Sequence, residues 1–237
     1  MRKKRYNNSI NWTFSAAKAA PKAGYFKRYP EEIMTKSIER SIKDQYAKFF
    51  EKSDWNIFKK SADYYFETAA KILKKDIQYG EEYLKLLRRN VTKRLFIGIG
   101  CELLLKAIYL KNGFCINNLK RGKKLPNQDP YKIADIDPND FMDDNTLSFN
   151  QLIGKLFDIE DYGQEKDLIE KGLKISKVFR NKEGHVIVLW HNFNPQNYRD
   201  VETSLIGIYR NSFNEDLQLT FSVADGEVAN FNIKKIG

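Results

Sequence analysis

Apolar residues recur at intervals of three and four along much of the chain, which is the spacing of a helix with one buried face. The strongest example is residues 81–113, which begin with acidic side chains and end in Asn112 and Gly113, a common helix stop. We expect this segment to form the central helix of the fold. Its expected buried stripe comprises Leu84, Leu87, Val91 and Leu95.

Two glycines, Gly98 and Gly100, lie in the middle of this expected central helix. Glycine lowers helix stability by about 1 kcal/mol relative to alanine, so two glycines so close together need a structural reason. Either the helix bends at this point or a neighbouring element approaches it closely. The sequence leaves both explanations open.

Other segments with helical signals lie on both sides of the central one. Ser53 and Asp54 can cap a helix that Gly80 ends. Further helices are expected over residues 30–50, 146–157, 164–181 and 198–213. In the helix expected over 164–181, the buried stripe is predicted to contain Leu168, Ile175 and Phe179, with Ile169 and Leu173 beside it. A turn is expected directly afterwards, at residues 181–184.

Beyond Asn214 the apolar positions alternate with polar ones, which is the pattern of a strand with one buried face. Asp225 and Gly226 lie between two such runs and indicate a hairpin turn. The apolar positions of the two runs are Leu217, Leu219, Phe221, Val223, Val228, Phe231 and Ile233. The predicted fold class is therefore mainly α, a helical bundle with a small C-terminal β-hairpin.

These signals divide the chain into three regions. Residues 1–50 are expected to form a basic N-terminal arm and a helix, residues 51–213 the helical bundle, and residues 214–237 the hairpin. Within the bundle, residues 114–145 are rich in Asn, Lys, Pro and Asp, which is typical of a surface insertion between core helices.

The charge of the chain is unevenly distributed. The formal net charge is +10, and residues 1–60 contain 15 Lys and Arg against 6 Asp and Glu, which accounts for +9 of it. A localised basic surface favours a polyanionic partner such as RNA, because phosphates release counterions when basic side chains bind them. Solubility alone is the other explanation of a basic arm.

The two cysteines, Cys101 and Cys115, have neither the number nor the spacing of a disulfide framework or a zinc site. No apolar run approaches the length of a membrane span, and the basic start MRKKR is followed by polar residues rather than by a signal-peptide core. We therefore expect a cytoplasmic protein without a membrane segment.

The sequence RNKEGH places Arg180, Asn181 and His185 at the end of an expected helix. Metal-independent RNA cleavage requires the 2′-hydroxyl to lose a proton as it attacks the phosphorus, while the leaving 5′-oxygen gains one. His185 can transfer protons near neutral pH, and Arg180 can bind the phosphate and its developing charge. Five residues on a helix separate two side chains by about 140°, so both can face one phosphate only if the helix breaks between them. Gly184 offers that break.

Three features occur in the order found in the HEPN superfamily of ribonucleases: a long central helix containing CELLLKAIYLKNGF, a short helix LSFNQLIGKLF, and RNKEGH at a helix end. On these features residues 51–213 resemble that superfamily. The resemblance implies a metal-independent endoribonuclease that needs no cofactor, with Arg180 and His185 as the catalytic pair.

The resemblance also implies a homodimer in which two copies of the motif form one composite RNA-binding site. Asn181 would then bind phosphate or base, and Glu102 would line the site with Lys106 as its supporting partner four residues on. Many HEPN proteins are toxins or anti-phage defence effectors, so an antitoxin or a defence-system partner protein is expected. No metal is expected, because His191 and His185 have no Cys or paired carboxylate at ligand spacing.

Each of these residues also has a structural interpretation. Arg180 can stabilise the C-terminus of a helix, and His185 can be a hydrogen-bonded histidine near the core. Glu102 and Lys106 have the spacing of an ordinary helix salt bridge. Two other functions therefore stay open: a non-catalytic HEPN-like module that binds RNA, nucleotide or protein, and a structural protein whose hairpin pairs with another subunit.

Overall fold

The computed structural model describes residues 55–72, 82–119, 130–135, 141–185, 194–221 and 230–237. Within these ranges the side chains of residues 82–89, 119, 141–145 and 182–185 are not described. The described helices are α2 (Trp55–Lys71), α3 (Glu82–Lys111), α4 (Phe149–Ile159), α5 (Lys166–His185) and α6 (Pro195–Phe213). Helix accounts for 73% of the described residues, so the prediction of a mainly α fold is confirmed.

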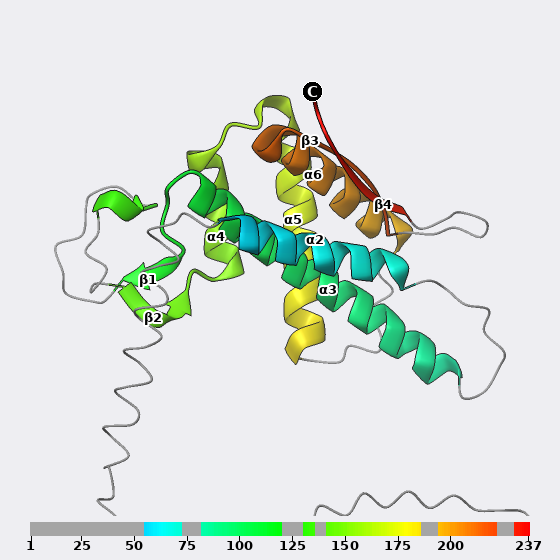
Figure 1. The fold of residues 1–237 in the computed structure, drawn as a ribbon. Helices are drawn as coiled ribbons and strands as arrows, with labels where there is room; N and C mark the ends of the chain where they lie inside the picture. The colour runs from blue at the N-terminus through cyan, green and yellow to red at the C-terminus, as the bar shows by residue number, and fades with distance from the viewer. Residues whose placement is uncertain (1–54, 73–81, 120–129, 136–140, 186–193, 222–229) are drawn as a thin grey trace, which may run out of the picture. The chain divides into compact units, whose positions relative to one another are not determined.

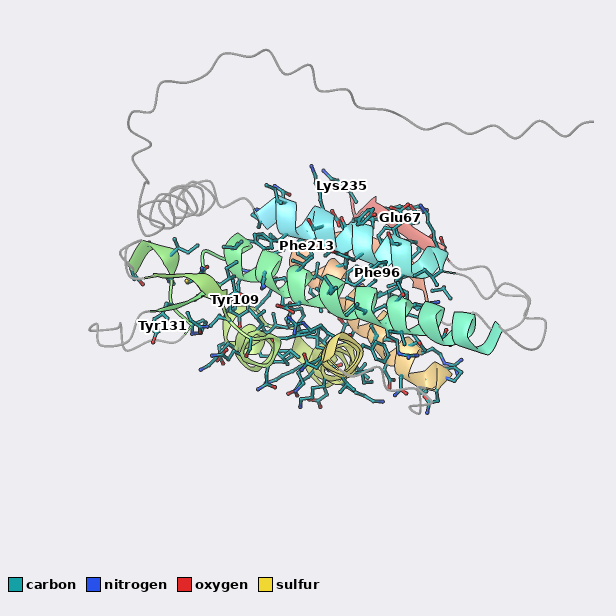
Figure 2. The ribbon with its side chains drawn as sticks, turned by 90° about the horizontal axis from the view of Figure 1, so that it is seen from below. Glu67, Phe96, Tyr109, Tyr131, Phe213 and Lys235 are labelled. Atoms are coloured by element: carbon teal, nitrogen blue, oxygen red, sulfur yellow. The ribbon has the colours of Figure 1, made fainter. Side chains whose placement is uncertain are left out.

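The helices pack in two directions. Helix α2 lies along α3, while α5 crosses α3 steeply and also packs against α6 (Figures 1 and 2). Helix α4 also contacts α3 and α5. The core lies between these helices, and its largest fully buried side chains include Phe66, Tyr109, Phe179, Tyr209 and Phe221.

Local sequence explains where α4 and α6 begin. Ser148 accepts a hydrogen bond from the backbone N–H of Gln151, whose side chain in turn bonds the backbone of Ser148. This reciprocal capping box satisfies N–H groups that a helix N-terminus leaves without partners. Asn194 and Asn197 cap α6 in the same way, and Pro195 occupies its first turn, where a missing N–H costs nothing.

The two glycines of α3 mark close contacts with neighbouring helices. Helix α3 is continuous through both, and a Cβ atom at Gly100 would lie 2.6 Å from the ring of Phe66 in α2. A Cβ atom at Gly98 would lie 2.5 Å from the Cβ atom of Arg180 in α5. Close approach, rather than a bend, is therefore the reason for glycine at these two positions.

The buried face of α5 differs from the predicted one. Leu168, which the apolar spacing predicted to lie in the buried stripe, is 53% exposed. The buried stripe instead combines Ile169, Gly172, Leu173, Ser176 and Phe179. Small residues lie on this face because α6 approaches so closely that a Cβ atom at Gly172 would lie 2.3 Å from that of Ser204.

The C-terminal end of α5 also differs from the prediction. The turn expected at residues 181–184 is absent, since α5 remains helical through Gly184 and ends at His185. Glycine costs a helix only about 1 kcal/mol, and the neighbouring Lys182 and Glu183 are good helix formers. Gly184 therefore does not break the helix between Arg180 and His185.

The predicted insertion, residues 114–145, contains regular structure and some of the core. Strand β1 (Asn117–Leu119) pairs antiparallel with β2 (Phe141–Thr146), and a short 3-10 helix spans Ile133–Asp135. Cys115 and Ile116, which precede β1, are buried. The two strands are distant in sequence and short, so local alternation could not identify them.

The C-terminal strands pair as expected. Strand β3 (Glu215–Thr220) runs antiparallel to β4 (Asn230–Lys235), with Leu217 opposite Ile233 and Leu219 opposite Phe231. The prediction of a small antiparallel pair at this end of the chain is confirmed. The expected hairpin turn lies outside the described residues, as do the expected N-terminal arm and the helix over 30–50.

Phe221, which follows β3, is anchored in the bundle by two buried charged side chains. The ammonium of Lys93 in α3 donates to the carbonyl oxygen of Phe221, and the carboxylate of Glu202 in α6 accepts from its N–H. The Phe221 ring also packs against Phe66, with ring centroids 6.2 Å apart. The strand pair is thus part of the same core as the helices.

The described residues contain neither a membrane-spanning helix nor a cluster of metal ligands. None of the helices described has a stretch both long enough and apolar enough to span a bilayer. No group of three or more His, Cys, Asp and Glu side chains in these ranges is arranged to hold a metal ion.

Candidate functional site

Arg180 lies where α5 crosses α3. The crossing is close because Gly98 has no side chain, and the backbone nitrogen of Arg180 would be only 2.7 Å from a Cβ atom there. Four residues after Gly98 on the same face of α3 is Glu102. The backbone of Arg180 therefore rests on Gly98 while its side chain extends along α3 towards Glu102.

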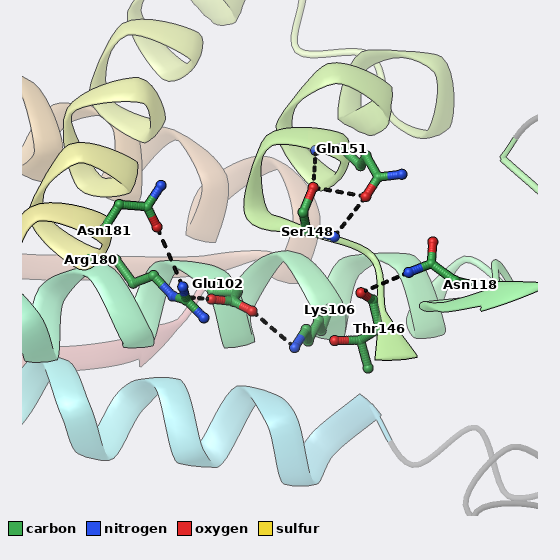
Figure 3. Close-up of polar contacts among 8 residues, drawn as sticks. All are labelled: Glu102, Lys106, Asn118, Thr146, Ser148, Gln151, Arg180 and Asn181. Carbon is green, nitrogen blue, oxygen red and sulfur yellow. Dashed lines mark hydrogen bonds and ion pairs between the residues drawn. The ribbon is translucent and has the colours of Figure 1, made fainter. Parts of the chain in front are cut away.

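The guanidinium of Arg180 forms an ion pair with Glu102 (Figure 3). Its Nε atom is 2.8 Å from one carboxylate oxygen, and Nζ of Lys106 is 3.1 Å from the other. Nη1 of Arg180 also donates a hydrogen bond to Oδ1 of Asn181 at 3.4 Å. Four of the five residues that the sequence singled out thus lie in one cluster.

Exposure differs across this cluster. The side chains of Glu102 and Lys106 are 13% and 12% exposed, whereas that of Arg180 is 38% exposed. The carboxylate is therefore shielded from solvent and held between two cations, while part of the guanidinium reaches the surface. Because one anion faces two cations, the three side chains together carry one net positive charge.

A guanidinium has five N–H donors in a planar fork. Among the side chains that the structure describes, Glu102 and Asn181 engage the Nε–H and one N–H of Nη1. The remaining donors have no protein acceptor in this part of the chain. Glu102 and Asn181 therefore orient the guanidinium, and none of its other N–H groups bonds a residue that the structure describes.

His185 is the last residue of α5, and its side chain is among those not described. Because α5 is helical from Arg180 to His185, the two positions lie about 140° apart around the helix axis. The structure therefore brings Glu102, Lys106 and Asn181 to Arg180 but does not bring the helix position of His185 to the same side. His191 lies outside the described residues.

The neighbouring thiol is not suited to nucleophilic chemistry. Cys101 is fully buried, and burial raises the pKa of its thiol to about 12, although a hydrogen bond with Ser176 opposes this rise. The reactive form of cysteine is the thiolate, which is not formed near neutral pH at such a pKa.

A second polar cluster lies between α2, α6 and β3. Nζ of Lys59 is 3.1 Å from Asp63 and 2.7 Å from Glu215, and the hydroxyl of Tyr209 donates to Asp63. Burial raises the pKa of Asp63 and, with the nearby carboxylate, that of Tyr209. These contacts join α2, α6 and β3 through charged and polar side chains.

Two features of the site were not identified from the sequence. Gly98 was expected to lie at a bend or a close contact, but Arg180 could not be identified as its neighbour. The pattern of one helix does not show which other helix crosses it or at which residue. Lys177 and Asn150, from α5 and α4, are joined by a hydrogen bond of 2.9 Å. No sequence signal connected these two residues.

Comparison of the chain with family models, with curated proteins and with solved structures finds no match.

Proposed function

We propose that this chain is a metal-independent endoribonuclease of the HEPN type, with Arg180 and His185 as its catalytic pair. In this reaction His185 takes the proton of a ribose 2′-hydroxyl or gives one to the leaving 5′-oxygen. The 2′-oxygen forms a bond to phosphorus as the 5′-oxygen leaves, which yields a 2′,3′-cyclic phosphate and a 5′-hydroxyl end.

The proposal depends on the contacts and the exposure of the Arg180 side chain. Its guanidinium is oriented by a shielded carboxylate, Glu102, at 2.8 Å and is still 38% exposed. A pre-oriented cation at the surface can stabilise charge that develops on a phosphate without reorganising during the reaction. Asn181 beside it can donate a further hydrogen bond to phosphate or base.

The geometry of α5 favours a site shared between two chains. Arg180 and His185 lie about 140° apart on an unbroken helix, so one α5 is poorly suited to direct both side chains at one phosphate. A two-fold homodimer, which the HEPN resemblance implies, would let Arg180 of one copy act with His185 of the other.

The biological role and location belong to the same proposal. From the resemblance to the HEPN superfamily, we propose that the enzyme is a toxin or an anti-phage defence effector in the cytoplasm. An antitoxin or a defence-system partner protein would inhibit it. The basic composition of residues 1–60 suits RNA as the substrate.

Cleavage of labelled RNA in the presence of EDTA tests the proposal. We expect the wild type to produce 2′,3′-cyclic phosphate ends, and Arg180→Ala and His185→Ala to lower the rate by at least about 100-fold, as loss of an acid–base group or of a charge-stabilising donor does. Arg210→Ala and His191→Ala are matched controls. Arg210 also forms an exposed ion pair, with Glu165 at 3.0 Å, but it lies on α6.

Equal cleavage by the wild type and both site variants would reject the proposal. Tight RNA binding by the wild type without cyclic phosphate products would instead support a non-catalytic RNA-binding module.

A further inference from the structure

We infer that Lys177, whose ammonium donates a hydrogen bond to Asn150, forms a subsite that binds a phosphate of the RNA strand one helical turn before Arg180. This inference rests on the proposed function, because it extends the same surface of α5 along the substrate. The group that Lys177 binds is a backbone phosphate next to the reacting one.

The charge of Lys177 differs from that of its neighbours on α5. Lys171 and Lys174 form ion pairs with Asp200 at 2.9 Å and Glu170 at 2.7 Å. Among the side chains that the structure describes, Lys177 contacts no carboxylate, and its hydrogen-bond acceptor is the neutral amide oxygen of Asn150. Its positive charge is therefore available to an external anion.

Lys177 is also held in position. Its Nζ atom donates to Oδ1 of Asn150 at 2.9 Å, and Asn150 lies in the first turn of α4, which the Ser148 cap fixes. Lysine loses considerable side-chain entropy when it is immobilised, so a partner that already orders it lowers the cost of binding a phosphate. An ammonium has three N–H donors, and Asn150 engages one of them.

The position of Lys177 along α5 suits a strand that passes Arg180. Lys177 lies three residues before Arg180 and four before Asn181, so it neighbours both on the surface of the helix. Three residues correspond to about 4.5 Å along the axis. That length is close to the rise of one stacked nucleotide, about 3.4 Å.

The test measures binding of an oligonucleotide that cannot be cleaved. A fluorescently labelled 2′-O-methyl oligouridine lacks the attacking hydroxyl, so its affinity for the full chain can be followed over a range of salt concentrations without turnover. Each phosphate contact with a single strand contributes about 0.7 to the slope of log affinity against log salt. We expect Lys177→Ala to lower the slope by about 0.7 and Lys177→Arg to preserve it.

Lys174→Ala is the matched control, because it removes the same charge one turn earlier on α5 from a lysine that Glu170 already pairs. We expect it to change the slope by less than half as much. Asn150→Ala should weaken binding while leaving the slope near the wild-type value, because the cation stays but is no longer oriented. With cleavable RNA, Lys177→Ala should raise KM and leave kcat unchanged.

The outcomes separate this inference from the proposed nuclease. Equal slopes for Lys177→Ala and Lys174→Ala overturn the subsite, even if the wild type cleaves RNA. A loss of slope confined to Lys177→Ala supports the subsite, even if no variant and no wild-type sample produces cyclic phosphate. A wild type that does not bind the oligonucleotide overturns the subsite as well.

Discussion

Gly98 of α3 receives the backbone of Arg180 of α5 with no space for a side chain between them. A Cβ atom at position 98 would lie 2.5, 2.7 and 2.8 Å from Cβ, N and Cα of Arg180. Two of these three atoms belong to the main chain, which cannot rotate out of the way. The place of Arg180 along α3, and hence its reach to Glu102, depends on this contact.

Gly98→Ala should therefore displace Arg180. We expect a loss of about 1–3 kcal/mol in the free energy of unfolding from overpacking. RNA cleavage should fall by roughly 100-fold, because a shift of about 1 Å in a catalytic group is enough for that. Denaturation in urea and cleavage in EDTA measure the two effects.

Gly100→Ala is the matched control for this variant. It lies two residues away on α3, and its Cβ atom would meet the ring of Phe66 at 2.6 Å rather than the helix that carries Arg180. It should lose comparable stability and keep cleavage within a few-fold of the wild type at a temperature where both variants are folded. Equal losses of activity in the two variants would show that Gly98 acts only through stability.

The carboxylate of Glu102 should couple energetically to Arg180. Glu102→Gln leaves Arg180 and Lys106 close together without their common anion, so we expect it to lower the free energy of unfolding by about 1–3 kcal/mol. In a double-mutant cycle with Arg180→Gln, measured by urea denaturation, the coupling energy should be about 0.5–2 kcal/mol, because the two residues are in contact.

The surface pair Lys71–Glu67 provides the comparison for that cycle. Its side chains are far more exposed, and exposed pairs contribute about 0–1 kcal/mol. A Glu102–Arg180 coupling no larger than that of the surface pair would mean that the guanidinium is not held by the carboxylate in solution.

Asp63 should make the stability of the protein fall as the pH rises above its ordinary pKa of 3.8. Burial raises the pKa of Asp63 in the folded state, so folding favours its protonated form. This contribution is fully present below pH 3.8 and is lost as the pH rises through the folded-state value. Asp63→Asn is neutral at every pH. Its free energy of unfolding relative to that of the wild type should therefore increase from pH 3.8 up to the folded-state pKa of Asp63 and then level off.

Tyr209→Phe should extend to higher pH the range over which stability falls as Asp63 ionises. The Tyr209 hydroxyl donates to Asp63 and lowers its pKa, so removing the hydroxyl allows the pKa to rise further. Urea denaturation at a series of pH values compares the three proteins. Parallel pH profiles for the wild type and Asp63→Asn would show that Asp63 titrates alike in the folded and unfolded states.

Two inactive variants should restore activity in one dimer if the site is shared between chains. A heterodimer of Arg180→Ala and His185→Ala contains one site with both wild-type residues and one with neither, so cleavage should recover to on the order of half the wild-type rate. The two variants would be coexpressed with different affinity tags and purified through both. A heterodimer as inactive as either parent would place Arg180 and His185 of a single chain in the same site.

Helical spacing predicted the helices well because it reports burial of large apolar side chains. It predicted the extents of α3 and α6 and the strand pair from residue 215 onwards closely. It failed on α5, where Gly172 and Ser176 lie on the buried face and Leu168 is exposed. A close helix crossing selects small residues, and these carry no hydrophobic signal.

Burial of charged residues in α3 was likewise not predicted. The apolar spacing of α3 predicted Val91 and Leu95 in the buried stripe, yet Lys93 and Arg94 are more buried than either. Lys93 is buried because its ammonium has the Phe221 carbonyl as a partner, and that partner lies 128 residues away. Glu102 and Lys106 could be nominated because their contact is local, whereas the contact of Glu102 with Arg180 depends on how α5 crosses α3.

The attachment of Phe221 to Lys93 and Glu202 affects how the protein folds during synthesis. The ring that packs against Phe66 belongs to a residue that emerges from the ribosome after all the described helices. A nascent chain that ends before Phe221 exposes apolar surface and holds two charged side chains without their main-chain partners. The core around Phe66 is therefore completed only after Phe221 has been synthesised.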